Sequence, residues 1–119
     1  MNYYIDENCL FCKIVKGEIP STKVYEDDEV YAFRDIEPQA PQHIVIVPKE
    51  HIASTNEINE ENSKVVGAVF AAAAKIAKTE GFAENGYRIV NNCGTDGGQT
   101  VGHLHFHLLA GRSLQWPPG

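Results

Sequence analysis

Five short stretches of the chain have the residue pattern of β-strands. Residues 23–27 (KVYED) and 30–35 (VYAFRD) alternate apolar and polar side chains around an acidic turn, which predicts a hairpin. Residues 43–48 (HIVIVP) form a continuous β-branched run, typical of a strand that is covered on both faces. Residues 87–92 (YRIVNN) and 103–110 (HLHFHLLA) complete the set.

One longer stretch repeats its apolar residues at the spacing of an α-helix. Between residues 59 and 81, apolar side chains stand at positions 65, 66, 69, 70, 73, 76 and 77. Asn59 is the predicted N-cap and Gly81 the predicted stop. Residues 12–19 predict a second, short helix. The order helix, three strands, helix, two strands predicts an α+β fold with a five-stranded antiparallel sheet.

Composition narrows this picture. A chain of 119 residues, 43% of them hydrophobic, predicts a single domain over 1–119 with a real core. The net charge of -6 argues against a protein that binds the nucleic-acid backbone. It leaves room for a small anionic ligand, because backbone N–H groups can supply local positive potential. The absence of a long apolar run and of a secretory signal predicts a cytoplasmic protein with no membrane partner.

Three of the five histidines occupy alternate positions in the last predicted strand: His103, His105 and His107. Because residues i and i+2 of a strand share a face, about 6.6–6.8 Å apart, the imidazoles should lie together and the intervening apolar residues should face the helix. Three explanations fit this pattern. The histidines could be polar groups on a solvated face, or ligands of one metal ion. They could also be catalytic, one attacking phosphorus while a neighbour protonates the leaving group.

The loop before this strand is rich in glycine, with four glycines in residues 94–102. Such a loop can present several backbone N–H groups to one anion, and Gln99 and Thr100 would add side-chain donors. A turn needed only for topology would have the same composition. Beside three histidines, anion binding is the better explanation.

Cys9 and Cys12 form a lone C-x-x-C pair. The spacing is typical of a metal or redox pair rather than of a disulfide framework. A tetrahedral zinc site needs two further ligands from elsewhere, so two reduced buried cysteines and a redox pair remain alternatives. Cys93 has no visible partner in the sequence and is assigned no role.

The segment HLHFHLL resembles the H-x-H-x-H-x-x signature of the histidine-triad (HIT) superfamily. FCKIVKGEIP, AFRDIEPQAPQHIVIVPKEHI, NNCGTDGGQTVGHLHFHLLAGR and the terminal WPPG are similar to its Hint branch, the nucleoside phosphoramidate hydrolases. The resemblance covers most of the chain in the right order. It implies a HIT-like fold and a hydrolase that cleaves the P–N bond of purine nucleoside 5′-phosphoramidates through a covalent nucleotidyl-histidine. A dinucleoside polyphosphate hydrolase of the Fhit type and a non-catalytic nucleotide-binding module are the alternatives.

The resemblance also implies roles for the polar residues. His105 would be the nucleophile, and His107 would contact phosphate oxygens and help to protonate the leaving group. Transferase relatives have glutamine at the third histidine, so His107 favours hydrolysis. His43 would support the nucleophile, although a buried core histidine is the alternative. Thr100, where the family commonly has serine, would lie near the leaving nitrogen.

The same comparison implies the nucleotide site and the assembly. Asp35 would bind the ribose hydroxyls. An apolar slot would hold the base, formed by Phe11, Ile14, Ile19 and Ile36. The alternative is that these four are ordinary core residues. The tail 112–119, if it is not disordered, would reach the partner subunit of a two-fold homodimer with joined sheets. The expected nucleotide-binding residues are Phe11, Ile14, Ile19, Asp35, Ile36, Asn92, Gly98, Gln99, Thr100, His105, His107 and Trp116.

Several bacterial members of the family bind one zinc ion near the N-terminus. On that pattern the ligands are Cys9, Cys12, His51 and His103, and the ion is structural because protein fills all four positions. It would tie the N-terminal arm, residues 1–8, and the cysteines to the sheet. Many Hint-branch members with the same tail lack these cysteines, so the chemistry itself does not need the metal.

Overall fold

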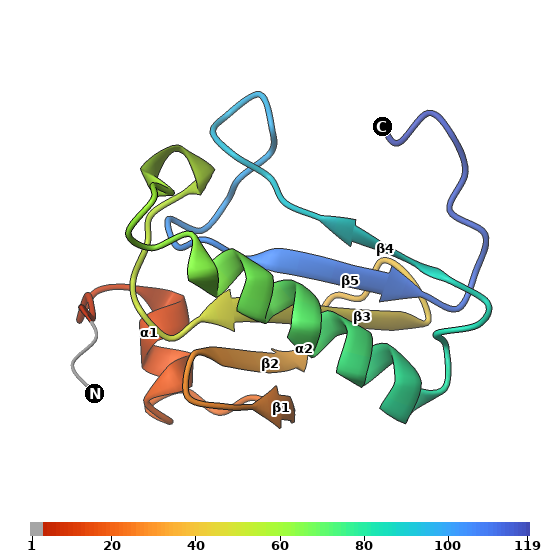
Figure 1. Ribbon diagram of the computed structural model, residues 1–119, viewed down its shortest axis with the longest axis horizontal. Coiled ribbons are helices and arrows are strands. Elements are labelled where there is room, and N and C mark those ends of the chain that lie inside the picture. The colour runs from red at the N-terminus through yellow and green to blue at the C-terminus, as the bar shows by residue number, and fades with distance from the viewer. Residues whose placement is uncertain (1–3) are drawn as a thin grey trace.

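The computed structural model describes residues 4–119 and has the predicted α+β architecture (Figure 1). The short helix α1 and the long helix α2 enclose a five-stranded sheet, with a single 3-10 turn, η1, ahead of α2. In chain order the elements are α1 (Leu10–Val15), β1 (Lys23–Glu26), β2 (Val30–Arg34), β3 (Gln42–Pro48), η1 (Thr55–Glu57), α2 (Lys64–Glu80), β4 (Tyr87–Val90) and β5 (Phe106–Ala110).

The strands form one antiparallel sheet in the order β1-β2-β3-β5-β4. β1 and β2 form the predicted hairpin, and the Asp27 carboxylate closes its turn by accepting the backbone N–H groups of Glu29 and Val30. β3 lies at the centre, paired with β2 and β5. This position explains its continuous apolar sequence, since both of its faces are buried.

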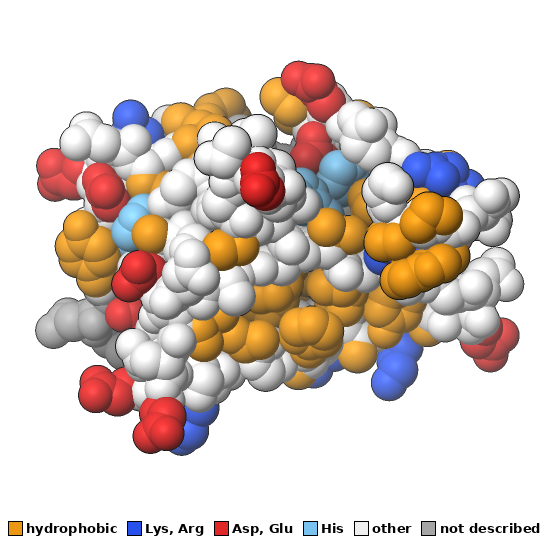
Figure 2. All heavy atoms as spheres, turned by 90° about the horizontal axis from the view of Figure 1, so that it is seen from above, with side chains coloured by type: hydrophobic (Ala, Val, Ile, Leu, Met, Phe, Trp, Pro, Cys, Tyr) orange, Lys and Arg blue, Asp and Glu red, His pale blue; other side chains and the backbone are white. Residues whose placement is uncertain are grey.

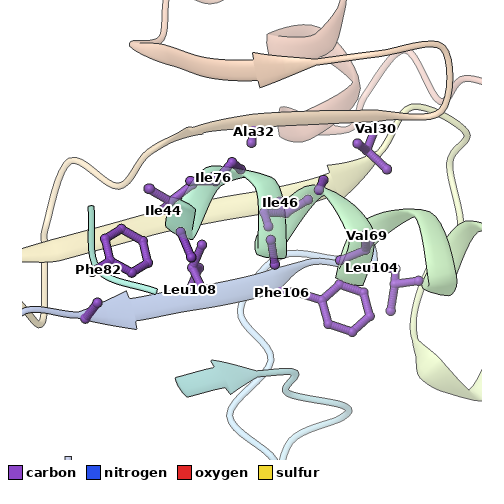
Figure 3. Packing of buried hydrophobic residues seen from close by; sticks show 14 of the residues in the cluster. Val30, Ala32, Ile44, Ile46, Val69, Ile76, Phe82, Leu104, Phe106 and Leu108 are labelled. Carbon is purple, nitrogen blue, oxygen red and sulfur yellow. The ribbon is translucent and has the colours of Figure 1, made fainter. Parts of the chain in front are cut away.

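Helix α2 covers one face of the sheet (Figure 3). Its apolar stripe, which includes Val69 and Ile76, packs over Ile44, Ile46 and Leu108, and all five side chains are almost wholly buried. Alanines at positions 72, 73 and 77 of the stripe let the helix approach the strands closely. Burial of each large side chain stabilises the fold by about 1.5–3 kcal/mol, so this layer is the main core.

The opposite face of the sheet is covered by α1. Phe11, Cys12 and Ile14 of the helix pack against Phe33 and Val45 of the sheet. Alternation along the strands separates the two cores, because Val45 points to α1 whereas its neighbours in β3 point to α2. The site residues described below lie on the α1 side.

The prediction that α2 begins at Asn59 is wrong. The helix starts at Lys64, and Asn59 instead accepts the backbone N–H groups of Glu61 and Asn62 in a preceding turn. The apolar repeat begins only at Val65, and residues 59–64 are all polar, so they have no apolar side chain to bury against the sheet. Gly81 ends the helix as predicted, in the left-handed conformation with φ of 85°.

Other boundaries also differ from expectation: α1 ends at Val15 rather than at residue 19, and β4 ends at Val90 rather than at residue 92. Helix α1 begins at Leu10 rather than at residue 12, because the Cys9 sulfur caps its first turn by accepting the Cys12 N–H. The last strand begins at Phe106, so residues 103–105 precede the regular ladder. Within residues 4–119, no helix has both the length and the apolar character needed to cross a bilayer.

Candidate active site and metal site

The three histidines of the triad lie on the α1 side of the sheet, as the alternation predicted. Leu104, Phe106 and Leu108 belong to the core beneath α2, on the other face. The His105 and His107 rings are 5.1 Å apart, and Phe11 of α1 packs edge-on against the ring of His105 at 5.0 Å. The alternation therefore persists through residues 103–105, although they lie outside the regular strand.

The hydrogen bond at one nitrogen of His105 determines the role of the other. The Nδ1 atom lies 2.7 Å from the backbone carbonyl oxygen of His103. A carbonyl only accepts, so Nδ1 carries the proton of the neutral ring and Nε2 carries the lone pair. His105 is 4% exposed, so its orientation is fixed by packing. The ring is in the tautomer that a nucleophile acting through Nε2 requires.

A second chain of hydrogen bonds fixes the proton on His107. The backbone N–H of Gln39 donates to Nδ1 of His43 at 3.0 Å, which places the His43 proton on Nε2. That N–H donates to Nδ1 of His107 at 2.8 Å. Neutral His107 therefore carries its own proton on Nε2. His43 is hydrogen-bonded to His107 and not to His105, so any support it gives the nucleophile passes through His107.

Burial favours the neutral form of His43 and His107. Burial, with smaller contributions from the neighbouring His105 and His43 and against the Asp35 carboxylate, lowers the pKa of His107 to about 4. Burial also lowers the pKa of His43, although the Asp35 carboxylate, 3.5 Å from His43 Nε2, opposes the change. At neutral pH the free protein thus holds uncharged rings here.

The glycine-rich loop is built by its own polar side chains. Gln99 accepts the Gly94 N–H and donates to the carbonyl oxygens of Ala53 and Val101, so its amide is engaged within the protein. Asn92 donates to the Gly97 carbonyl at 2.6 Å. A Cβ at Gly97 would lie 2.4 Å from the Cys93 carbonyl oxygen, so the loop excludes any larger residue there.

The remaining candidates for nucleotide binding differ in exposure. Phe11 and Ile14 are buried under α1, and Ile19 is partly buried beside them. Ile36 is 93% exposed and Trp116 is 83% exposed. Two further residues of the expected set, Gly98 and Thr100, lie exposed in the loop before the triad. The triad residues and Phe11 are thus brought together, whereas Ile36 and Trp116 stand on the surface.

The tail that carries Trp116 lies against its own subunit at its start. Arg88 of β4 donates to the carbonyl oxygens of Leu114 and Gln115, at 2.6 and 2.9 Å. These bonds fix the direction in which the chain leaves the sheet, and the exposed indole follows directly after them.

Cys9, Cys12, His51 and His103 converge in a separate cluster, with their ligand atoms all within 4.8 Å of one another. Cys9 Sγ lies 3.3 Å from His103 Nδ1, and Cys12 Sγ lies 3.5 Å from His51 Nδ1. Tetrahedral zinc with Zn–S of about 2.3 Å and Zn–N of about 2.05 Å separates S and N ligands by about 3.6 Å. The spacing of the four groups therefore fits such an ion.

The proton positions in this cluster also suit a cation. His103 Nε2 donates to the Pro48 carbonyl at 2.9 Å, so the Nδ1 lone pair faces the two sulfurs. Burial raises the pKa of the Cys12 thiol to about 11, so that without a cation the sulfur keeps its proton. Figure 2 shows histidine side chains reaching the surface at two separate places, in keeping with two distinct clusters.

Asp35, His43 and His107 also bring ligand atoms within 4.8 Å of one another, but they do not suit a metal. The Gln39 N–H occupies Nδ1 of His43 and holds its proton on Nε2, the nitrogen that faces the other two groups. A protonated nitrogen has no lone pair to give a cation. This trio is therefore arranged to hold and transfer protons.

Several groups at the site could not be recognised from the sequence. The backbone N–H of Gln39 and the backbone carbonyls of Pro48 and His103 set the three tautomers, and backbone groups carry no residue-specific signal. Asn91 donates to the backbone carbonyl of His105 at 2.9 Å. Its sequence context, a polar residue at the end of a strand, marks it no more than its neighbour Asn92.

Comparison with known proteins assigns the chain to a family. The model of the HIT domain matches residues 16–114. The chain belongs to the HIT domain family. This HIT protein is 51% identical to the purine nucleoside phosphoramidase of Escherichia coli over 108 residues, which cover 91% of each chain. It is 49% identical to the 14 kDa zinc-binding protein of Zea mays over 116 residues, covering 96% of this chain and 90% of the maize protein.

A solved structure agrees with the fold of this HIT protein. The HIT family hydrolase from Legionella pneumophila superimposes with a TM-score of 0.92 at 54% identity, covering 94% of this chain and all of the other. The agreement confirms the α+β fold and the five-stranded antiparallel sheet.

Proposed function

We propose that this HIT protein hydrolyses the P–N bond of purine nucleoside 5′-phosphoramidates through a nucleotidyl-histidine intermediate. The observation that carries the proposal is the pair of tautomers at the triad. His105 presents a lone pair on Nε2, and His107 presents an N–H on its own Nε2. A nucleophile and a proton donor are thus side by side, with ring centroids 5.1 Å apart.

The reaction has two displacements at the α-phosphorus. In the first, His105 Nε2 attacks phosphorus, the P–N bond breaks, and the leaving amine takes a proton from the His107 side. The negative phosphate raises the proton affinity of His107 while it is bound. In the second, water displaces His105, which releases the nucleoside monophosphate. The attacking water gives up a proton to the His107 side, which replaces the one passed to the amine, while the hydrogen bond from His43 holds the His107 ring in place.

In this proposal the nucleotide lies across the α1 face of the sheet. Asp35 binds the ribose hydroxyls, and the apolar residues Phe11, Ile14, Ile19 and Ile36 hold the base. Asn92, the glycine-rich loop and Thr100 border the phosphate and the leaving group. The name of the Escherichia coli relative, a purine nucleoside phosphoramidase, supports this substrate class.

The decisive experiment detects the covalent intermediate. Wild-type protein is mixed rapidly with adenosine 5′-phosphoramidate, quenched and analysed by mass spectrometry for an adenylyl adduct on His105. His105→Ala should lose hydrolysis while retaining nucleotide binding. An adduct on another residue, or full activity of that variant, would show that the nucleophile is misassigned.

Parallel assays on diadenosine polyphosphates test the alternative Fhit-type activity. A faster rate on these than on the phosphoramidate would favour the alternative. Absence of turnover on both, with nucleotide binding intact, would favour a non-catalytic binding module.

We further propose that Cys9, Cys12, His51 and His103 hold one structural zinc ion. When bound, the ion supplies a closed tetrahedral link between α1 and the segment that carries the triad. The zinc-binding relative from maize supports the assignment. Elemental analysis should find about one zinc per chain, and none after Cys9→Ser and Cys12→Ser substitution. Metal-free wild-type protein prepared with zinc present throughout would contradict the site.

A homodimer that joins two sheets through their β4 edges completes the proposal. In the described part of the chain, β4 pairs with β5 on one side only. Exposed aromatic residues lie at this end of the sheet, Phe70 against Phe106 and Tyr87 in β4 itself. Figure 2 shows a band of hydrophobic side chains across this face. Sedimentation equilibrium should give twice the chain mass, and Phe70→Glu should weaken association.

A further inference from the structure

The backbone of His105 is held by a side chain where the sheet ends. The ladder between β4 and β5 runs out at the pair Val90 and His107, so the His105 carbonyl lies beyond it. Asn91, directly after β4, donates its Nδ2–H to that carbonyl at 2.9 Å. The amide thus takes the place of the next rung of the ladder.

Asn91 is itself oriented by a third segment. Thr55, in η1, donates its hydroxyl to the Asn91 Oδ1 atom. With the oxygen of the amide facing Thr55, the nitrogen faces His105, which fixes the direction of both hydrogen bonds. Thr55, Asn91 and the His105 carbonyl therefore connect η1, β4 and the segment before β5.

Two carbonyls determine where the His105 ring lies. The carbonyl of His103 holds the ring at Nδ1, and the carbonyl of His105 is held by Asn91. The residue between them is fixed by its own backbone, since Leu104 N–H donates to the Ile52 carbonyl at 2.6 Å. Without Asn91 the backbone carbonyl of His105, the residue that must point at phosphorus, would lose the side-chain hydrogen bond that holds it.

We infer that Asn91, oriented by Thr55, is a positioning residue that sets the line of attack of His105. The inference rests on the proposed function, because it assumes that His105 is the nucleophile. Asn91 acts through the backbone of His105 and does not contact the reacting atoms. Its loss should therefore lower kcat while leaving KM nearly unchanged.

The experiment compares matched variants on adenosine 5′-phosphoramidate. Asn91→Asp keeps the size of the side chain and an oxygen for Thr55, but replaces the donor with an acceptor that faces the His105 carbonyl. We expect kcat to fall about tenfold in Asn91→Asp and in Asn91→Leu, with KM within about twofold of wild type. Thr55→Val should lower kcat about threefold, since the amide loses its orientation but keeps its donor.

A double variant tests whether Thr55 acts through Asn91. Thr55→Val added to Asn91→Leu should cause no further loss, because the amide that Thr55 orients is gone. Thr79→Val, the same change on the exposed surface of α2, is the control and should behave as wild type.

A readout that needs no turnover separates this inference from the proposed function. In ¹⁵N-labelled protein, the His105 imidazole should be the Nδ1–H tautomer in wild type and a mixture of tautomers in Asn91→Asp. If wild type leaves phosphoramidates intact while the tautomer changes in the variant, the proposed function is wrong, but Asn91 still positions the His105 ring. Unchanged kcat and an unchanged tautomer in the variants would overturn the positioning role. The positioning role would also be overturned if the variants lose kcat only to the extent that their free energy of unfolding is lower.

Discussion

Acidification should destabilise this protein through His107 in a way that one substitution can isolate. Burial lowers the pKa of His107 from its ordinary value of 6.5 to about 4 in the folded protein. Above pH 6.5 the ring is neutral in both the folded and the unfolded chain, so it contributes no pH dependence. Between pH 6.5 and pH 4 the unfolded chain binds a proton that the folded chain does not, and the free energy of unfolding falls as the pH falls.

The magnitude follows from the two pKa values. Between pH 7.5 and pH 5, a shift from 6.5 to about 4 corresponds to a loss of about 2 kcal/mol. His107 is only half-buried, and solvent screening reduces the effect, so we expect about 1 kcal/mol from this residue. Below about pH 4 both states are protonated and the contribution levels off.

The assay is urea unfolding of wild type and His107→Gln at pH 7.5 and pH 5.0, with both proteins in the same zinc-bound or chelator-treated state. Glutamine does not titrate, and its side-chain oxygen can still accept the hydrogen bond from His43. Protonation of carboxylates and metal ligands destabilises both proteins equally. The difference between the two proteins in how far the free energy of unfolding falls from pH 7.5 to pH 5.0 therefore isolates His107. If His107→Gln loses as much stability as wild type on acidification, His107 is not held neutral by burial.

Three further predictions concern packing, backbone geometry and the base site. Leu108→Ala, in the core beneath α2, should lower the free energy of unfolding by about 2–5 kcal/mol in urea titrations, and a loss below 1 kcal/mol would contradict the burial. Gly111→Ala should cost about 1–3 kcal/mol, because Gly111 has φ of 96° and a Cβ there would lie 2.8 Å from Pro41 Cβ; unchanged thermal stability would refute this geometry. Ile36→Ser should leave stability within about 0.5 kcal/mol of wild type, since the side chain is 93% exposed, but should raise KM for the phosphoramidate if Ile36 borders the base.

The sequence by itself determined the architecture and the separation of the two faces. The β-branched run at 43–48 predicted the central strand, and the apolar repeat from Val65 predicted the helix that covers it. Alternation around His105 predicted which side chains enter the core and which lie with the imidazoles. These features follow from strand and helix periodicity, which depends only on residues close together in the chain and can therefore be recognised from the sequence alone. The histidine-triad signature carried the family assignment in the same way.

The tertiary structure decided which protons lie where, and hence what each histidine can do. The tautomers of His43, His103 and His105 are set by the backbone groups of Gln39, Pro48 and His103. Whether these groups lie within hydrogen-bonding distance depends on how loops pack, which no local pattern specifies.

The same reason explains the misplaced boundaries and why the hydrogen bond from Asn91 to His105 could not be foreseen. Asn59 has the chemistry of an N-cap, but the helix begins where the sheet offers a surface to pack against, at Lys64. Asn91 differs from Asn92 only in what lies opposite: the carbonyl of His105 for one and that of Gly97 for the other. Residue type determined the chemistry available at each position, whereas the packing of distant segments determined which of it is used.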